Sequence, residues 1–202
     1  MEQNLDHQPT ETVLPPEAEE EKPRLRAALV DILETLLLSL VLFLAINAIS
    51  ARVRVEGSSM EPSFHDGEFV IVSRLDYRFG SPDYGDVVVF HYPGNPEEEY
   101  IKRVVGLSGD NVRIADGTVY VNGQVLEEPY IQADPVYSGE WDVSEDHIFV
   151  LGDNRNNSSD SHSWGPLPME NVIGRAVFVY WPLSDWGVIK SIEPLAVSAS
   201  QP

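Results

Sequence analysis

A long apolar run near the N-terminus constrains this 202-residue chain more than any other feature. Residues Ala27–Ile49 contain only two charges, Asp31 and Glu34, both in the first third of the run. As a helix the run would span about 34 Å, enough for a hydrocarbon core of about 30 Å. Large apolar residues would cover every side of it, whereas a core helix of a soluble domain has one apolar face. The sequence therefore predicts a transmembrane helix over residues 27–50.

A cleavable secretory signal is the main alternative, because the small residues Ala48, Ser50 and Ala51 follow the apolar run. Against it, 26 residues rich in acids precede the run, where a short basic region would be expected. Three basic residues precede the run and two follow it closely, which slightly favours a cytoplasmic N-terminus. The sequence has no second apolar run of spanning length, so we expect a single-pass anchor with the remaining chain outside the cytoplasm.

Charge and composition exclude several function classes. The first 21 residues carry seven acids, no Lys or Arg and few large apolar residues, which predicts a disordered acidic tail over residues 1–26. The formal net charge of −20 argues against a nucleic-acid partner, which would need a basic surface. The absence of cysteine excludes disulfide scaffolds, thiolate metal sites and cysteine nucleophiles. We expect no cofactor and no metal, and a loosely ordered C-terminal tail over residues 191–202.

Residues 51–190 predict an all-β domain, barrel-like or sandwich-like, built of short antiparallel strands. Runs rich in Val, Ile, Tyr and Phe are broken by turn residues, and no stretch shows helical periodicity over three turns. The hairpin signals are strongest at Asp116-Gly117 and Asn122-Gly123. The predicted strands are Arg52–Glu56, Glu68–Arg74, Asp86–Tyr92, Tyr100–Gly106, Asn111–Ala115, Thr118–Val121, His147–Leu151 and Val172–Trp181. We expect long loops around Asn95–Glu99 and Asp134–Asp146.

The segment Val55–Phe64 contains a Gly-Ser-Ser sequence directly after a predicted strand. A simple turn is the ordinary interpretation of such a cluster. The functional alternative is a nucleophilic serine on a tight turn, where backbone N–H groups form an oxyanion hole. Gly57 would permit unusual backbone angles and close approach of a substrate.

The segment Tyr100–Asp110 places Lys102 and Arg103 inside an otherwise apolar strand. Strand alternation predicts that one of them points inward and the other outward. Burial would lower the pKa of an inward lysine, and a neutral amine can take a proton from a serine hydroxyl. The structural alternative is an edge-strand lysine that discourages aggregation.

The segment Gly152–Pro168 is a dense polar loop after a predicted strand. A calcium loop of the EF-hand type does not fit, because Arg155 takes the third position and the sixth is not glycine. A solvated turn is a second alternative. Polar loops of this kind also supply hydrogen bonds that hold a catalytic group in place.

Together the anchor and the sequences GSSMEPS, YIKRVVGLSGD and GDNRNNSSDS, in this order, resemble the bacterial type I signal peptidases. These are membrane-bound serine/lysine peptidases that remove signal peptides, and the likeness covers nearly everything after residue 27. The resemblance implies Ser59 as the nucleophile, Lys102 as the general base and Ser158 as the hydroxyl that positions the lysine amine. It also implies that Asp153, Asp160 and Arg103 brace the site through charge and hydrogen bonds.

The oxyanion hole and the substrate pocket follow from the same resemblance. Gly57 stands where some members carry a serine that assists the oxyanion hole, so backbone donors of the turn Gly57–Ser58–Ser59 are expected to serve. Small substrate side chains before the scissile bond would fit shallow apolar pockets. The candidate substrate-binding residues are Met60, Ile101, Phe69 and Ile71. The expected partners are precursors carrying signal peptides, membrane lipid and the secretion machinery, at the outer face of a bacterial cytoplasmic membrane.

The sequence differs from many members of this family in two respects. His162 stands where many members have arginine, so a salt bridge with Asp160 would depend on pH. The single anchor and compact body are similar to the forms of Gram-positive bacteria and cyanobacteria.

Ser59 lies eight residues beyond Ala51, so an extended link reaches at most about 26–29 Å and the site must work close to the bilayer.

Competing functions remain open on the sequence alone. A membrane-anchored β binding or adhesion module would explain the anchor, and a self-cleaving Ser/Lys protein would use the same chemistry. A triad of Ser59, His162 and Asp160 is the alternative catalytic arrangement. Asp160 and His162 are two positions apart in a polar loop, which does not orient an imidazole toward Ser59, so Lys102 is the predicted base.

Overall fold

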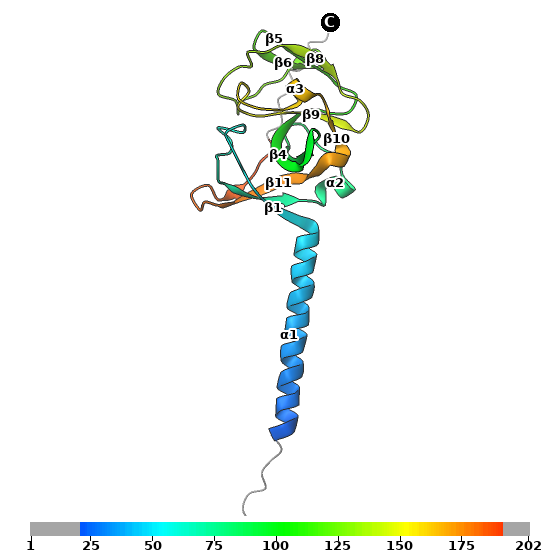
Figure 1. The fold of residues 1–202 in the computed structure, drawn as a ribbon, viewed down its shortest axis with the longest axis vertical. Coiled ribbons are helices and arrows are strands. Elements are labelled where there is room, and N and C mark those ends of the chain that lie inside the picture. Colours follow the sequence, from blue (N-terminus) through cyan, green and yellow to red (C-terminus); the bar gives the residue numbers. More distant parts are fainter. Residues whose placement is uncertain (1–20, 192–202) are drawn as a thin grey trace, which may run out of the picture. The chain divides into compact units, whose positions relative to one another are not determined.

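The structure is a computed structural model that describes residues 21–191. The chain divides into two units, Met1–Ala45 and Ile46–Pro202. The predicted disordered tail falls outside the described residues over positions 1–20, and most of the predicted C-terminal tail does so over positions 192–202. Figure 1 shows the helix and the β unit in the colours of the sequence.

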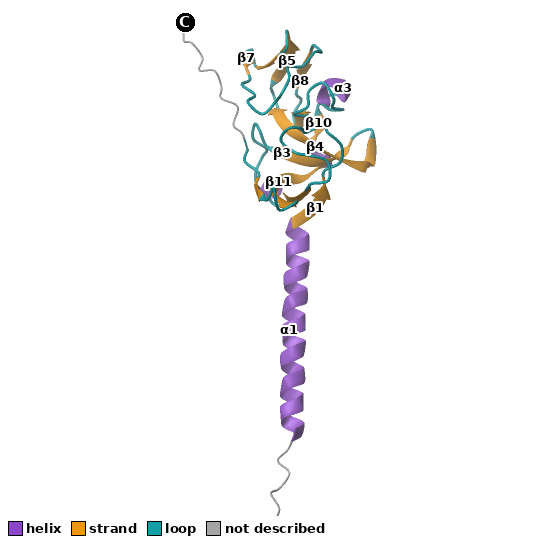
Figure 2. Ribbon diagram, turned by 90° about the vertical axis from the view of Figure 1, so that its left-hand side faces the viewer, coloured by secondary structure: helices purple, strands orange, loops and turns teal. Residues whose placement is uncertain are grey.

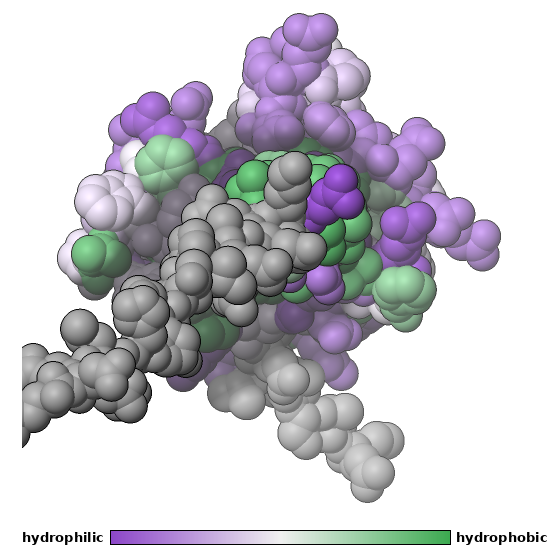
Figure 3. All heavy atoms as spheres, turned by 90° about the horizontal axis from the view of Figure 1, so that it is seen from below, coloured by the Kyte–Doolittle hydropathy of each residue, from purple (hydrophilic) through white to green (hydrophobic). Residues whose placement is uncertain are grey.

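The helix α1 (Glu21–Ile49) begins six residues before the boundary expected from hydropathy. Pro23 does not prevent this, because a first-turn N–H has no partner within a helix and its loss costs no helical hydrogen bond. From Leu25 to Ile49 the helix is long and apolar enough to cross a membrane, and its large apolar side chains are exposed. Figure 3 shows apolar atoms, in green, gathered near the middle of this view, while hydrophilic atoms, in purple, make up most of its rim.

Up to residue 191, where the described part of the chain ends, the β unit has many short strands and three single-turn helices. The first half contains β1 (Ser50–Arg54), β2 (Phe69–Ser73), α2 (Asp76–Phe79), β3 (Val87–Tyr92), β4 (Asn95–Gly106), β5 (Asn111–Ala115) and β6 (Thr118–Val121). The second half contains β7 (Gln124–Val125), β8 (Gly139–Asp142), β9 (His147–Leu151), α3 (Ser161–Trp164), β10 (Leu167–Pro168), the 3-10 helix Met169–Asn171, β11 (Val172–Trp181) and β12 (Gly187–Val188).

These strands form two antiparallel sheets. The larger has the order β1-β2-β11-β3-β4-β9-β10, with β12 paired to β11, and the smaller has the order β7-β6-β5-β8. Figure 2 shows the smaller sheet at the end of the β unit away from β1. The predicted mainly β, antiparallel class is therefore confirmed, and within the described residues both sheets are open rather than closed into a barrel.

Two expected loops contain strand. Asn95–Glu99 forms the first part of β4, where Tyr92 pairs with Asn95 and His91 pairs with Glu99. A tight turn at Pro93 and Gly94 joins β3 to β4. Backbone pairing holds the exposed, charged end of this hairpin together with side-chain hydrogen bonds from Asn95 and Tyr100 to Glu98. The expected loop Asp134–Asp146 contains the short strand β8, which pairs with β5. The charged and polar composition of both segments indicated loops, but each segment forms strand because a neighbouring strand pairs with it.

Apolar clusters on both faces of the larger sheet fix the segments that carry polar residues. One cluster joins β2, β3 and β11 to Val55, Met60 and Phe64, the apolar residues that flank the Gly-Ser-Ser sequence. A second cluster packs β4 and β9 against β5 and β6 of the smaller sheet. A third includes Leu167, with Trp164 packed against it, and so anchors the far end of the polar loop. Both sides of β4, an interior strand between β3 and β9, are therefore covered.

Candidate active site

The turn after β1 leaves Ser59 partly exposed between two buried apolar residues, Val55 and Met60. Val55 and Met60, each 1% exposed, hold the two sides of the turn in the core. Gly57 has a φ of 78°, a left-handed conformation that favours glycine, and its N–H donates to Asp66 Oδ1 at 2.8 Å. Gly57 therefore shapes the turn but has no free donor for an oxyanion. The Ser59 N–H makes no hydrogen bond within the described residues and remains the available donor.

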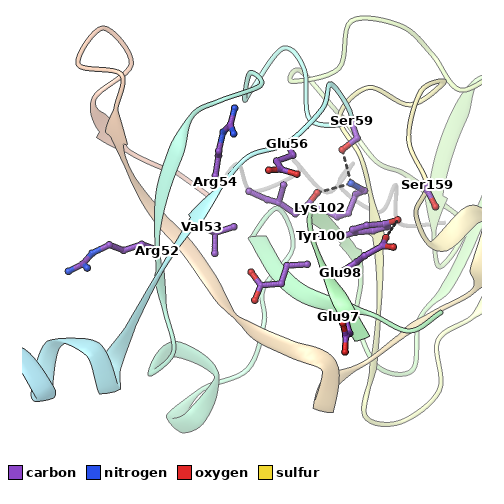
Figure 4. A pocket seen from close by; sticks show the side chains of 12 residues that line it. Arg52, Val53, Arg54, Glu56, Ser59, Glu97, Glu98, Tyr100, Lys102 and Ser159 are labelled. Carbon is purple, nitrogen blue, oxygen red and sulfur yellow. Dashed lines mark hydrogen bonds between the residues drawn. The ribbon is translucent and has the colours of Figure 1, made fainter. Parts of the chain in front are cut away.

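Lys102 on β4 reaches Ser59. Its Nζ lies 2.7 Å from Ser59 Oγ and 2.9 Å from the carbonyl oxygen of Ile101. Lys102 is only 3% exposed, so its amine is largely withdrawn from water. Figure 4 shows the two side chains pointing toward each other from the turn and from the strand, with the contact drawn as a dashed line. The structure brings together the predicted nucleophile and the predicted base, 43 residues apart in sequence.

Burial changes the acid–base behaviour of Lys102. Desolvation lowers its pKa from 10.5 to about 8, and the negative charges of Asp160 and Asp153 oppose that shift. Because burial disfavours the charged form, about a tenth of the amine is neutral at pH 7, and the neutral share grows through pH 8. A neutral amine within hydrogen-bond reach of a hydroxyl meets the geometric requirement for a general base.

Arg103 is also buried, contrary to the expectation that it or Lys102 would face water. The two side chains leave opposite faces of β4, but both faces are covered, so Arg103 is 2% exposed. Its guanidinium makes two hydrogen bonds to Asp153, 2.9 Å from Nε and 2.6 Å from Nη2, and donates to the carbonyl oxygen of Gly85. Asp153 is fully buried. This ion pair links β4, the strand that carries Lys102, to the start of the polar loop.

The polar loop packs against the nucleophile turn through Gly152. The Gly152 N–H donates to Asp160 Oδ2 at 2.9 Å, and Asp160 is fully buried. A Cβ at position 152 would collide with the carbonyl oxygen of Ser59 and with Ser158, so only glycine fits. Ser158 Oγ is buried, but it has no hydrogen-bond partner among the described residues. The implied contact between Ser158 and the lysine amine is therefore absent, because that amine is directed at Ser59 and Ile101.

His162 binds Asp160 rather than Ser59. Its Nδ1 lies 2.6 Å from Asp160 Oδ1, and its ring stacks on Tyr137 with centroids 3.9 Å apart. Asp160 also accepts the His162 N–H at the start of α3. The imidazole is thus held by the acid and the tyrosine. The triad of Ser59, His162 and Asp160 is not assembled, since the described partner of the Ser59 hydroxyl is Lys102.

Two asparagines of the polar loop hold the nucleophile turn and were not singled out by sequence reasoning. The Asn154 N–H donates to the carbonyl oxygen of Ser59, and its side chain donates to the carbonyl oxygen of Ser58. The Asn157 side chain donates to Ser58 Oγ at 2.9 Å. Ser58 therefore serves the architecture of the turn. The polar composition of the loop predicted hydrogen bonds of this kind, but not which residues make them.

A pocket of about 670 Å³ opens beside Ser59. Residues from the start of the β unit line one side and residues of β4 line the other, as Figure 4 shows. The lining residues are Arg52, Val53, Arg54, Glu56, Ser59, Glu97, Glu98, Glu99, Tyr100, Ile101, Lys102 and Ser159. Ile101 is thus at the predicted substrate pocket.

The other candidate wall residues lie elsewhere. Met60 is buried in the core. On β2, Val70 and Val72 face that core, so Phe69 and Ile71 point to the opposite face, where the Phe69 ring contacts the Tyr180 ring at 5.8 Å. None of the three lines the pocket beside Ser59. The predicted strand is present as β2, but its residues Phe69 and Ile71 do not form a wall of this pocket.

The arrangement can perform acyl transfer with groups of the chain itself. It has a hydroxyl, a base with a lowered pKa, a backbone donor beside the hydroxyl and an adjoining pocket. Within the part of the chain that the structure describes, no group of three or more His, Asp or Glu residues could hold a metal ion.

Comparisons with known proteins agree with these features. The sequence model of the family described as "Signal peptidase, peptidase S26" matches residues 29–181. A signal peptidase I of Leptolyngbya laminosa is 42% identical over 188 residues, covering 89% of this chain and 93% of that protein. A probable signal peptidase I-2 of Synechocystis sp. is 40% identical over 163 residues, covering 77% of this chain and 75% of that protein.

A plant protein and a solved structure are also similar. Thylakoidal processing peptidase 1 of Arabidopsis thaliana is 38% identical over 149 residues, which are 68% of this chain and 44% of that protein. A crystal structure of a signal peptidase I from Enterococcus faecalis is 30% identical, with a TM-score of 0.44, over 47% of this chain and 96% of that chain.

Proposed function

The chain belongs to the signal peptidase family, peptidase S26, and from that premise we propose that Ser59 and Lys102 carry out its cleavage of peptide bonds. It is a serine peptidase of the signal peptidase I type, which acts on precursors that carry signal peptides. The 2.7 Å contact between Lys102 Nζ and Ser59 Oγ, made by a lysine that is 3% exposed, supports the assignment most directly.

Acylation begins when the neutral Lys102 amine takes the proton of the Ser59 hydroxyl. Ser59 Oγ attacks the carbonyl carbon before the scissile bond, and the Ser59 N–H donates to the oxygen that becomes negative. The ammonium of Lys102 then returns its proton to the leaving amine as the peptide bond breaks. The product is an ester between Ser59 and the signal peptide, together with the free mature protein.

Deacylation repeats the same proton transfers with water. Lys102 takes a proton from a water molecule, whose oxygen attacks the ester carbonyl, and the proton passes to Ser59 Oγ as the ester breaks. The buried carboxylates of Asp153 and Asp160 keep the pKa of Lys102 from falling further, so the amine can also act as an acid. Both half-reactions use one base.

The pocket beside Ser59 is the proposed substrate site. Its walls come from residues 52–56 and from residues 97–102 of β4, two stretches of largely extended chain. A peptide that enters it in an extended conformation would lie against both walls. Ile101 and Tyr100 offer apolar surface next to Lys102, which suits the small side chains expected before the cleavage site.

We propose that residues 25–49 anchor the enzyme in a bacterial cytoplasmic membrane, with the β unit outside the cytoplasm. Exported precursors present their cleavage sites on that side. The short link between the apolar helix and Ser59 keeps the site close to the lipid and to membrane-tethered precursors. Membrane lipid and the secretion machinery are the further proposed partners.

Incubating the full-length protein in detergent with one signal-peptide-bearing precursor tests the function. We expect a single cut, at the end of the signal peptide, from the parent protein and from Ser58→Ala, and none from Ser59→Ala. Ser58→Ala is the comparison variant: it loses the Asn157 contact to Ser58 Oγ, but Asn154 still holds the carbonyl oxygens of both turn residues. Cleavage by Ser59→Ala would refute the nucleophile, and no cleavage by the parent would favour a binding module.

Protease added to cells stripped of their outer layers tests the topology. The expected result is digestion of the chain after residue 51, with residues 1–26 protected until the membrane is permeabilised. The reverse pattern would contradict the proposed orientation.

A further inference from the structure

Two buried guanidinium groups flank one aromatic ring beneath the active site. The Arg103 guanidinium lies 4.2 Å from the centre of the Tyr130 ring, and that of Arg155 lies 5.9 Å from it. Arg155 is 1% exposed, yet the chemistry of Ser59 and Lys102 makes no use of it. Its carboxylate partner is Glu128, which follows β7 of the smaller sheet, so a distant segment of the chain meets the polar loop here.

Glu128 engages Arg155 with both oxygens. Nη1 donates to Oε2 and Nη2 donates to Oε1, the parallel geometry that matches a guanidinium to a carboxylate. The hydroxyl of Tyr130 donates to the same carboxylate at 2.9 Å. Pro129 lies between the two residues and restricts the backbone of this short segment. The segment Glu128–Tyr130 therefore holds the Arg155 guanidinium in one orientation.

The third donor of Arg155 points to the active site. Its Nε donates to the carbonyl oxygen of Gly152 at 3.0 Å. The N–H of the same glycine donates to Asp160, so both polar groups of Gly152 are held by buried charges. Because Gly152 lies directly against the carbonyl oxygen of Ser59, any shift of Gly152 is transmitted to the nucleophile turn.

Stability alone does not explain a buried ion pair. Taking two charges out of water costs about as much as their attraction returns, and apolar pairs of similar volume are often equally stable. The ion pair instead orients Arg155. Two parallel hydrogen bonds fix the plane of its guanidinium and therefore the position of its Nε.

We propose that Glu128 is a positioning residue for peptide cleavage, which it serves by orienting Arg155 so that Gly152 holds the Ser59 turn at the correct distance from Lys102. This inference rests on the proposed function of Ser59 and Lys102. It gives the smaller sheet a role in catalysis, although that sheet contributes no residue to the pocket beside Ser59.

Three variants of the full-length protein test the proposal. Glu128→Gln keeps the shape of the side chain and removes its charge. The double variant Glu128→Leu with Arg155→Met replaces the pair by apolar residues and removes the Nε contact to Gly152. Glu127→Gln is the matched control, because it changes an exposed acid at the adjacent position. The measurements are kcat and KM for one precursor, with the thermal unfolding temperature, Tm, of each protein.

The double variant is expected to keep a Tm close to that of the parent and to lose on the order of 10- to 100-fold in kcat, the effect of a small misplacement of reacting groups. KM should change by less than about twofold, because Glu128 and Arg155 do not line the substrate pocket. Glu128→Gln should show the same split between kcat and KM, and Glu127→Gln should match the parent.

Retention of kcat in a folded double variant would overturn the proposal, because the pair would then be structural only. Should the double variant fail to fold, an unchanged kcat in Glu128→Gln would overturn it equally. Parent protein and Ser59→Ala are included in the same assay. No cleavage by the parent would refute the proposed function itself, whereas an active parent with an equally active double variant refutes the positioning role alone.

Discussion

Replacing Lys102 by Met should make the stability of the β unit less dependent on pH. The parent lysine is 3% exposed, and burial lowers its pKa from 10.5 to about 8. Below pH 8 the amine is charged in both the folded and the unfolded protein, so the folded state carries the full cost of burying that charge. A pKa difference of this size is equivalent to about 3 kcal/mol. Met keeps the length of the side chain and has no charge to bury.

Proton binding at Lys102 decides whether the free energy of unfolding rises or falls with pH. Between pH 8 and 10.5 the unfolded protein binds more protons at Lys102 than the folded protein does, so the free energy of unfolding of the parent rises with pH. Between pH 7 and 9.5 this gain amounts to about 2 kcal/mol. The variant lacks the gain. It also lacks the hydrogen bonds of Nζ, worth about 1 kcal/mol each at any pH, and that constant loss cancels from the pH comparison.

Denaturant unfolding of both full-length proteins in detergent, at pH 7 and pH 9.5, measures the effect. Tryptophan fluorescence reports on the β unit alone, because all four tryptophans lie there. They are Trp141, Trp164, Trp181 and Trp186. The difference between parent and variant should shift by about 2 kcal/mol in favour of the parent at the higher pH. A difference that stays constant between the two pH values would refute a lowered pKa at Lys102.

Three further results are expected. In the parent, kcat/KM should rise about tenfold from pH 7 to pH 9, because the neutral fraction of Lys102 grows through a pKa of about 8, and a flat profile would contradict this. Gly152→Ala should lower kcat on the order of 100-fold, as its Cβ would displace the nucleophile turn, while Gly187→Ala, which meets only ordinary contacts, should not. Asp153→Asn should lower the free energy of unfolding by about 3 kcal/mol or more, because Arg103 keeps an unpaired buried charge; a loss under about 1 kcal/mol in denaturant unfolding would argue against that pair.

The sequence predicted those features that depend on local pattern. Alternating apolar residues located most strands of the larger sheet, and an amine inside such a strand indicated a base with a lowered pKa. A glycine before two serines predicted the tight turn, which the positive φ of Gly57 now shows. These inferences needed only the immediate neighbours of each residue.

Features set by distant contacts were missed or misassigned. Alternation says that Lys102 and Arg103 point to opposite faces, but not that other segments cover both faces of β4. The same limit applies to Phe69 and Ile71 as candidate pocket walls, since nothing local shows which segment of the chain lies beside Ser59. The pairing of Glu128 with Arg155 joins two loops, one after β7 of the smaller sheet and one after β9 of the larger, for which a single sequence gives no signal.

Precursor cleavage by Lys102→Arg and His162→Ala tests the central assignment most directly. Arginine keeps the positive charge of Lys102 but cannot give up its proton, so Lys102→Arg should be as inactive as Lys102→Ala. His162 binds Asp160 and not Ser59, so His162→Ala should retain substantial activity. An active Lys102→Arg variant beside an inactive His162→Ala variant would contradict the serine–lysine mechanism and make histidine the base.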